Sequence, residues 1–320
     1  MLVQSRDEMI QPAPVSIAPL KAGATKPRKI PLSDIVIDEA LIPNKPTQWF
    51  DNWRDPRPLP TTAQVRAALE IGHGGTAKVS HFPDLKLVVK FGRSERVPIS
   101  EGQALWILRQ YTNIPVPTVY GWCIDDTETF IYMERIEGET LTTRWRGLKP
   151  DQKLSVLAQL AEIVSTLRHV KPKGKTYVGS LCREPIKDQV WLNVPGPAPG
   201  PLNTTAEFND TFWRLADSLP GFPDHSYFVD VRRALPDNAP INLTHTDIYP
   251  DNILVSFDPE RPKIVGVVDW SECGWYPDYW EYVKAGSPEF NSDWDDCLPI
   301  WLGNYQTQKD AYEAYEVTGY

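Results

Sequence analysis

The chain has 320 residues, of which 41% are hydrophobic and 23% are charged, and its formal net charge is −9. This composition is typical of a globular protein, and the length leaves room for two lobes or two small domains. The sequence contains neither an apolar run of the roughly 18 residues that a membrane-spanning helix needs nor the apolar segment of a signal peptide. We therefore expect a cytoplasmic protein with no membrane partner. Its acidic balance repels phosphates, which argues against nucleic acid as a partner and favours a neutral or cationic substrate.

The first 60 residues are rich in proline and show little periodicity. We expect residues 1–30 to form a loosely ordered tail. Residues 31–64 are predicted to form an irregular segment that packs on the N-terminal lobe through Trp49, Phe50 and Trp53. The folded core is predicted to begin near Thr61.

Three glycines, Gly72, Gly74 and Gly75, precede a predicted strand at 87–91 that contains Lys90. Glycine lets backbone N–H groups approach phosphate oxygens closely. A lysine that follows three apolar residues in a strand either points at a negative group or reaches water from an edge strand.

A helix is predicted over 100–111, with Ser100 as its N-cap and one apolar stripe at positions 104, 105, 107, 108 and 111. Glu101 lies in its first turn, where an acidic side chain complements the helix dipole. A further strand begins at Phe130 and leads through Glu134 and Ile136 to Gly138.

Helices are also predicted near 151–169, 205–218 and 225–234, and residues 171–204 are predicted to form a long loop. Six aromatic residues in and after this region either line a cage for a cation or pack in the core: Trp191, Phe208, Trp213, Trp275, Tyr276 and Trp280.

The four cysteines have no zinc-type spacing. We expect Cys123, Cys182, Cys273 and Cys297 to be free thiols, mostly buried. Among them, Cys273 is the candidate to line a site, because it lies close after Asp269 in the sequence.

The most informative segment runs from Leu243 to Trp270. It contains His245, Asp247 and Asn252 in the order H-x-D-x-x-x-x-N, with Asp269 further along. Phosphoryl transfer needs such a set, because one carboxylate handles the proton of the attacking hydroxyl while an amide and a second carboxylate hold magnesium on ATP. Asp269 ends an apolar run, where a polar side chain is costly unless it has a strong partner such as a cation.

Local geometry brings these groups together. Two short β-type runs, 253–255 and 264–268, flank turn-forming residues at 258–262, which predicts a hairpin. Because its strands have similar length, Asn252 and Asp269 should lie at the same end, with Asp247 on the loop that enters the hairpin.

This segment resembles the catalytic core of the aminoglycoside phosphotransferase-like family, within the protein-kinase-like fold, and is most similar to its fungal small-molecule kinase-like members. The family usually has glycine where this chain has Thr246, and often an acidic residue where it has Ser271. The resemblance covers roughly residues 65–285. It implies an α+β bilobal protein-kinase-like fold. A small N-terminal lobe of antiparallel β-sheet plus one helix precedes a larger, mainly helical C-terminal lobe.

On this resemblance, residues 1–60 are the tail and irregular segment, 61–134 the nucleotide-binding lobe and 135–320 the catalytic and substrate-binding lobe. The cofactors would be ATP and Mg²⁺. The resemblance implies that Asp247 is the catalytic base, that His245 orders its loop, and that Asn252 and Asp269 bind the metal. It implies that the nucleotide phosphates are bound by Lys90, which pairs with Glu101, and by Gly72, Gly74 and Gly75, with Ala77 at the third glycine position. The backbones of Glu134 and Ile136 would bind adenine.

Three functions compete. The favoured one is ATP-dependent phosphorylation of a hydroxyl on an unidentified small molecule. A protein kinase is disfavoured, because no activation segment with an A-P-E end comes after Asp269. The alternative is a weakly active or inactive kinase-like protein that binds a nucleotide or a partner, since a fold alone does not establish activity.

Overall fold

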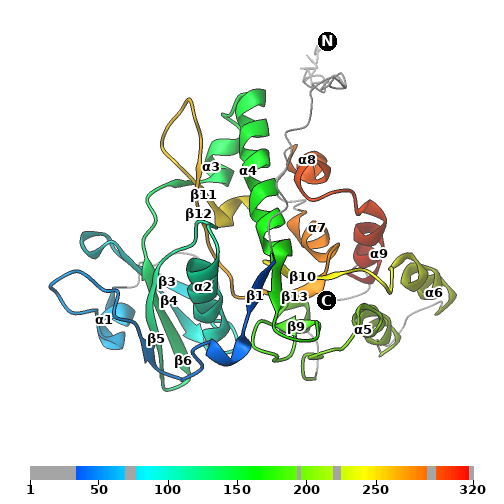
Figure 1. Ribbon diagram of the computed structural model, residues 1–320, viewed down its shortest axis with the longest axis horizontal. Coiled ribbons are helices and arrows are strands. Elements are labelled where there is room, and N and C mark those ends of the chain that lie inside the picture. The colour runs from blue at the N-terminus through cyan, green and yellow to red at the C-terminus, as the bar shows by residue number, and fades with distance from the viewer. Residues whose placement is uncertain (1–33, 69–76, 193–195, 219–224, 287–292, 317–320) are drawn as a thin grey trace, which may run out of the picture. The chain divides into compact units, whose positions relative to one another are not determined.

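The computed structural model describes residues 34–68, 77–192, 196–218, 225–286 and 293–316 (Figure 1). The predicted tail over 1–30 and the three glycines at 72, 74 and 75 lie outside these ranges.

An antiparallel sheet of five strands forms the N-terminal lobe, in the spatial order β2 (Gln48–Trp49), β5 (Val119–Asp125), β6 (Glu128–Glu134), β4 (Leu87–Arg93) and β3 (Ala77–Phe82). Successive side chains of a strand point to opposite faces. In β4, Leu87, Val89 and Phe91 pack on one face with Val65 of α1 (Thr62–Ala67). Lys90 therefore points to the other face.

Helix α2 (Ile99–Tyr111) packs against β5 and β6. It begins one residue earlier than predicted, and its N-cap is Pro98 rather than Ser100, whose side chain is buried in the first turn. Of the predicted apolar stripe, positions 104, 105, 107 and 108 are buried, while Tyr111 is exposed. Burial also extends beyond the stripe, because every residue from Ser100 to Leu105 is buried. A helix buried on more than one side must be covered by something besides the sheet.

Part of the cover comes from the segment between Ile35 and Phe50, in which the carbonyl of Pro43 accepts a hydrogen bond from Nε2 of Gln103 in α2. Its strand β1 (Ile35–Ile37) pairs in parallel with β8 (Val170–Pro172), which directly follows α4 (Pro150–His169), while its strand β2 pairs with β5. Between them lies a short 3₁₀ helix, Glu39–Leu41. As expected, Trp49, Phe50 and Trp53 pack on Tyr132, Trp122 and Tyr120 of the N-terminal lobe. The start of the segment also pairs with β8, which the sequence interpretation did not predict.

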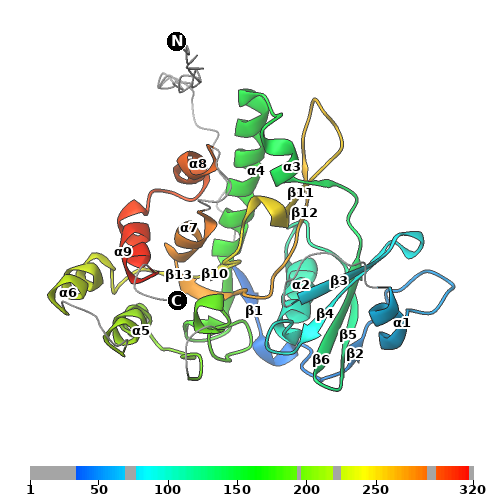
Figure 2. The ribbon, with the colours of Figure 1, turned by 180° about the vertical axis from the view of Figure 1, so that it is seen from behind.

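Helices dominate the rest of the chain, as Figure 2 shows from behind. Three of them, α4, α5 (Thr205–Ser218) and α6 (His225–Ala234), lie where the sequence predicts helices. The others are α3 (Leu141–Trp145), α7 (Trp280–Ala285), α8 (Trp294–Trp301) and α9 (Gln306–Glu316). The predicted loop over 171–204 is interrupted by β9 (Gly179–Ser180) and a 3₁₀ helix, Gln189–Leu192.

Two three-stranded sheets position the candidate site. In one, β11 (Ile253–Val255) lies between β12 (Ile264–Val267) and β7 (Glu139–Thr140). In the other, β13 (Gly274–Pro277) lies between β10 (Ile241–Thr244) and β9. The predicted hairpin is confirmed: Ile253 pairs with Val267, so Asn252 and Asp269 emerge at the same end.

The predicted fold class, α+β with a small sheet lobe and a mainly helical lobe, is confirmed. No helix among the described residues is long and apolar enough to cross a bilayer.

Candidate active site

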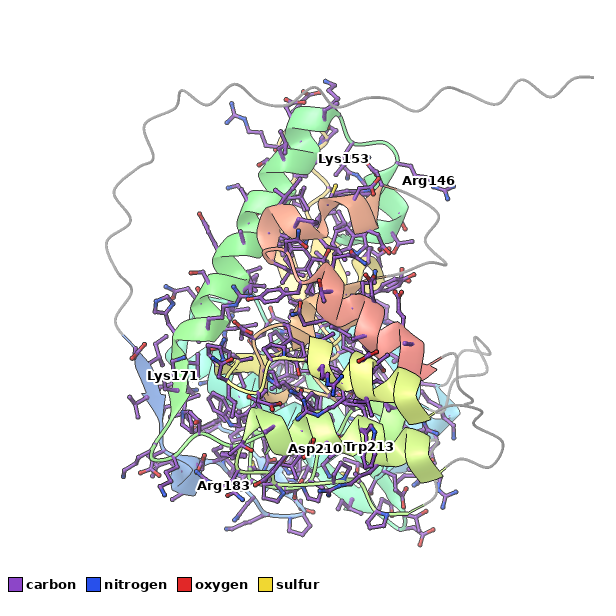
Figure 3. All side chains as sticks on the ribbon, turned by 90° about the vertical axis from the view of Figure 1, so that its right-hand side faces the viewer. Arg146, Lys153, Lys171, Arg183, Asp210 and Trp213 are labelled. Atoms are coloured by element: carbon purple, nitrogen blue, oxygen red, sulfur yellow. The ribbon has the colours of Figure 1, made fainter. Side chains whose placement is uncertain are left out.

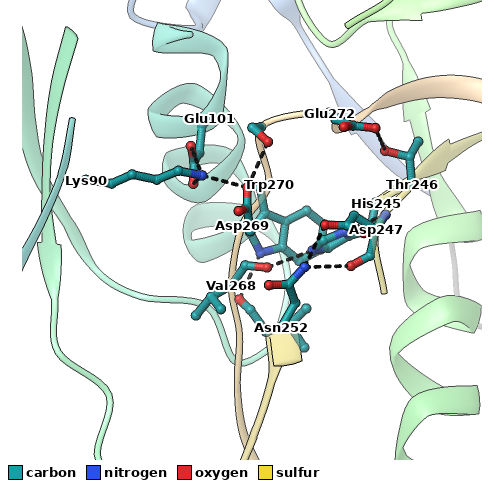
Figure 4. Close-up of polar contacts among 12 residues, drawn as sticks. Lys90, Glu101, His245, Thr246, Asp247, Asn252, Val268, Asp269, Trp270 and Glu272 are labelled. Atoms are coloured by element: carbon teal, nitrogen blue, oxygen red, sulfur yellow. Dashed lines mark hydrogen bonds and ion pairs between the residues drawn. The ribbon is translucent and has the colours of Figure 1, made fainter. Parts of the chain in front are cut away.

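Lys90 is held between two carboxylates from different parts of the chain (Figure 4). Its Nζ lies 2.9 Å from Oε2 of Glu101 on α2 and 2.6 Å from Oδ1 of Asp269 after β12. Its side chain is 8% exposed and that of Glu101 is 1% exposed. Burial alone would lower the pKa of Lys90, but the two carboxylates raise it above its usual value, so the side chain is a cation. The edge-strand alternative for Lys90 is excluded.

Asp269 lies at a sharp backbone turn, with φ at 60°. Its Oδ1 also accepts a hydrogen bond from Ser271 Oγ at 2.7 Å. Although burial would raise the pKa of Asp269, Lys90 and Ser271 hold it below its usual value. Asp269 is therefore an anion, and its second oxygen has no hydrogen-bond partner in the described part of the chain.

Asp247 and Asn252 contact each other directly. Nδ2 of Asn252 donates to Oδ2 of Asp247 at 2.7 Å and to its backbone oxygen at 3.0 Å. The backbone N–H of Val268 donates to the carbonyl of Asn252 at 2.9 Å, which joins this pair to the residue before Asp269. Both amide protons of Asn252 face Asp247, so its Oδ1 is left for another partner. Burial, and secondarily Asp269, raise the pKa of Asp247 to about 7.

His245 connects the two halves of the site. The backbone N–H of Asp247 donates to Nδ1 of His245 at 3.1 Å, so Nδ1 is unprotonated and Nε2 donates to the carbonyl of Val268 at 3.0 Å. Burial lowers the pKa of His245 to about 4, which keeps the ring neutral. With both ring nitrogens engaged by backbone groups, His245 orders its loop and has no free position for proton transfer.

Glu281 on α7 is a site residue that the sequence interpretation missed. Its two carboxylate oxygens accept the backbone N–H groups of His245 at 2.8 Å and Thr246 at 3.1 Å. It is 4% exposed, and burial raises its pKa to about 7. A glutamate inside the apolar run Trp280–Ala285 could have revealed it by the reasoning applied to Asp269.

A second buried group lies beside the same loop. Oγ1 of Thr246 contacts Oε2 of Glu272 at 3.4 Å, and burial raises the pKa of Glu272 to about 9. Lys284 pairs with the fully buried Asp188 at 3.0 Å. The sequence interpretation missed Glu272, Asp188 and Lys284. Glu272 lies close after Asp269 in the sequence, and Lys284 lies close after Glu281.

The predicted adenine-binding backbone lies where β6 ends. The N–H groups of Glu134 and Arg135 donate to the carbonyls of Thr118 and Lys86. The side chain of Glu134 accepts from Oγ1 of Thr118 at 2.7 Å. The N–H of Ile136 has no partner among the described residues and is available to a ligand.

The core-packing alternative holds for the aromatic residues. Phe208, Trp275, Tyr276 and Trp280 are at most 1% exposed. Phe208, Tyr276 and Trp280 pack in one cluster through ring contacts such as Phe208–Trp280 at 4.9 Å, while Trp275 packs in another. These four rings therefore form no cage for a cation in the described part of the chain.

The four cysteines are free, but only Cys273 and Cys297 are buried. Burial raises the pKa of Cys273 and keeps it a thiol. The expectation that most are buried is wrong for Cys123 and Cys182, which are half-buried.

The donor atoms fit a magnesium ion bound to a nucleotide. The amide oxygen of Asn252 and the carboxylate of Asp269 are hard oxygen ligands, and Mg²⁺ commonly takes one or two such protein ligands together with phosphates. No group of three or more His, Cys, Asp or Glu side chains suited to a metal occurs among the described residues. A site with two protein ligands does not require one.

Comparison with known proteins gives a family. A sequence model of the phosphotransferase enzyme family matches residues 71–316. Two curated Aspergillus fumigatus proteins, from different strains and both described as subtelomeric hrmA-associated cluster proteins, are 32% identical over 76 residues. That match covers 22% of this chain and 15% of each relative, so the chain spans a small part of their length.

Solved structures give weaker likenesses. Among them is a thermostable mutant of aminoglycoside phosphotransferase APH(4)-Ia in the apo form, with a TM-score of 0.47 and 14% identity over 78% of this chain and 92% of that one. Another is a ternary complex of such a mutant with AMP-PNP and hygromycin B, with a TM-score of 0.48 and 15% identity over 81% and 98%.

Thr246 has a left-handed backbone, with φ at 73°, and a β-branched residue is strained there. We expect Thr246→Gly to be more stable than Thr246→Ala by about 1 kcal/mol, since both lose the hydroxyl and only glycine loses the strain. Urea unfolding of the two variants measures this. Equal stability, or a more stable alanine variant, would contradict the expected strain.

Replacing Glu281 by glutamine turns one acceptor oxygen into a donor that faces a backbone N–H. We expect Glu281→Gln to lose about 1–3 kcal/mol of unfolding free energy, because a buried donor is left unsatisfied. The matched control is Glu162→Gln on the exposed face of α4, which should change stability by less than about 0.5 kcal/mol. Thermal and urea unfolding of both variants provide the comparison. Equal losses would contradict the conclusion that Glu281 stabilises the backbone at His245 and Thr246.

Proposed function

The chain belongs to the phosphotransferase enzyme family, and on this premise we propose that it transfers the γ-phosphate of Mg-ATP to a hydroxyl group of a small molecule. The observation that carries the proposal is the convergence of three groups. Asp247 and Asn252 are hydrogen-bonded to each other, and Asp269, joined to them through Val268, is ion-paired with Lys90.

Nucleotide binding is assigned to groups that can make further ionic contacts or hydrogen bonds. Lys90, oriented by Glu101, grips the phosphates, and the free N–H of Ile136 and the carbonyl of Glu134 bind adenine. Asn252 and Asp269 would hold Mg²⁺. When bound, this ion neutralises charge on the phosphates of ATP. The segment with Gly72, Gly74 and Gly75 is proposed to cover the phosphates.

Asp247 is proposed to accept the proton of the acceptor hydroxyl as its oxygen attacks the γ-phosphorus. The amide of Asn252 fixes the orientation of this carboxylate, and the neutral ring of His245 fixes the backbone beneath it. Glu272, Asp188 and Lys284 lie near the loop on the side of α7, so they are candidates for positioning the acceptor.

The stretch of chain after Asp269 favours a small acceptor over a protein substrate. Within five residues of Asp269 the chain enters β13, which pairs with both β10 and β9. In protein kinases an activation segment occupies this place and binds the peptide substrate. Here the same stretch is part of a sheet.

We expect Asp247→Asn to bind Mg-ATP within about threefold of the wild type and to lose at least about 100-fold in turnover, because the general base is removed. The exposed Asp251→Asn on the same loop is the matched control and should retain turnover. Binding is measured by calorimetry, and turnover by ³¹P NMR of Mg-ATP with a panel of small alcohols. If the wild type binds Mg-ATP and phosphorylates nothing, the alternative of an inactive nucleotide-binding protein is favoured.

The reaction should also depend on pH. The pKa of Asp247 is raised to about 7 by burial, so the carboxyl group is protonated and inactive as a base at lower pH. We expect kcat/KM to rise with pH between about 5.5 and 8 and then level off, since this ratio reports the ionisation of the free enzyme. A flat profile over this range would contradict the assignment of Asp247 as base.

A further inference from the structure

The position of helix α2 determines whether Glu101 contacts Lys90. The two residues come from different elements, and their contact at 2.9 Å depends on where α2 lies relative to β4. The sheet covers only one side of α2, yet the helix is buried more widely than that. We name the covering segment, Ile35–Phe50, the N-terminal strap.

The N-terminal strap is anchored at both ends. At its start, β1 pairs with β8, and Asp38 and Glu39 form ion pairs with Lys173 at 2.6 Å and Arg183 at 2.9 Å. Arg183 is labelled in Figure 3. At its end, β2 pairs with β5 of the five-stranded sheet. The strap therefore connects the sheet with the helical part of the molecule, in addition to the chain after β6.

Gln103 joins α2 to this connection. It lies two residues after Glu101 and is 3% exposed. Its Nε2 donates to the carbonyl of Pro43 in the strap at 2.7 Å, and its Oε1 accepts from Sγ of Cys182 at 3.3 Å. Cys182 lies just after β9, which pairs with β13 close after Asp269. One buried amide thus ties α2 to two separate segments.

Trp122 of β5 contacts the N-terminal strap from the side of the sheet. Its Nε1 donates to the carbonyl of Lys45 in the strap at 2.9 Å, and its ring lies against that of Phe50. A Cβ atom on Gly102 would lie 2.6 Å from Cε3 of this indole, so only glycine permits the close approach. Lys90, Trp122 and the strap thereby fix the positions of residues 101, 102 and 103, respectively.

We propose that Gln103 is a positioning residue for phosphoryl transfer: through the N-terminal strap and Cys182 it holds α2 so that Glu101 stays against Lys90. No phosphorylated activation segment is then needed to assemble this pair. The inference rests on the proposed function, because it takes Lys90 as the group that grips the nucleotide phosphates.

The test compares Gln103→Met, which removes both hydrogen bonds at similar volume, with Gln110→Met on the exposed face of the same helix. We expect the Kd of Mg-ATP to rise about tenfold in Gln103→Met, while that of adenosine, which has no phosphates, changes by less than about twofold. Hydrogen exchange of the α2 amides over 104–111 should be faster in Gln103→Met without nucleotide. The control variant should match the wild type in all three measurements. If Gln103→Met does not fold, the shorter Gln103→Asn replaces it and should show the same changes at smaller size.

The outcomes separate the two proposals. A wild type that does not bind Mg-ATP contradicts the proposed function, while the exchange comparison still tests the role of Gln103. Unchanged exchange together with an unchanged ratio of the ATP and adenosine constants would overturn the positioning role. A parallel loss of ATP and adenosine affinity would also overturn it, because that result indicates general destabilisation.

Discussion

The buried ammonium group of Lys90 is the constraint around which the site is built. Removing a charge from water costs several kcal/mol unless partners compensate it closely. Glu101 and Asp269 supply that compensation, and they come from α2 and from the loop after β12. Satisfying one cation therefore fixes three elements relative to one another. These are the elements that a nucleotide with its metal ion would have to contact together.

The remaining site groups are held by backbone contacts instead of ion pairs. Glu281 binds two consecutive N–H groups of the loop, His245 links Asp247 to Val268, and Asn252 turns both of its amide protons toward Asp247. The strain at Thr246 is maintained because these contacts determine the loop conformation from both sides. Such a loop is ready before any ligand arrives. Because β13 begins shortly after Asp269, there is no separate segment at this place in the described chain that could switch the loop between two conformations.

Much of this could be predicted from the sequence. The hairpin was predictable because its two apolar runs are similar in length and separated by turn residues, and it brings Asn252 and Asp269 together by local geometry alone. Contacts distant in sequence were not predictable in this way. The pairing of β1 with β8 depends on where α4 ends, and Ser100 looks like an N-cap although its side chain is buried in the first turn of α2. Glu281 could have been suspected from its place in an apolar run, but its partners, the N–H groups of His245 and Thr246, are not given by any spacing in the chain. The same holds for Gln103, which contacts the carbonyl of Pro43 and Sγ of Cys182. The domain boundaries, the roles of the site residues and the cytoplasmic location stay predictions.

The most direct test of the account is a crystal structure of the wild-type protein with Mg²⁺ and a non-hydrolysable ATP analogue. The account predicts one metal ion within about 2.0–2.1 Å of Oδ1 of Asn252 and of a carboxylate oxygen of Asp269. The carboxylate of Asp247 should face the γ-phosphate. A nucleotide bound elsewhere, or a metal ion that touches neither side chain, would contradict it.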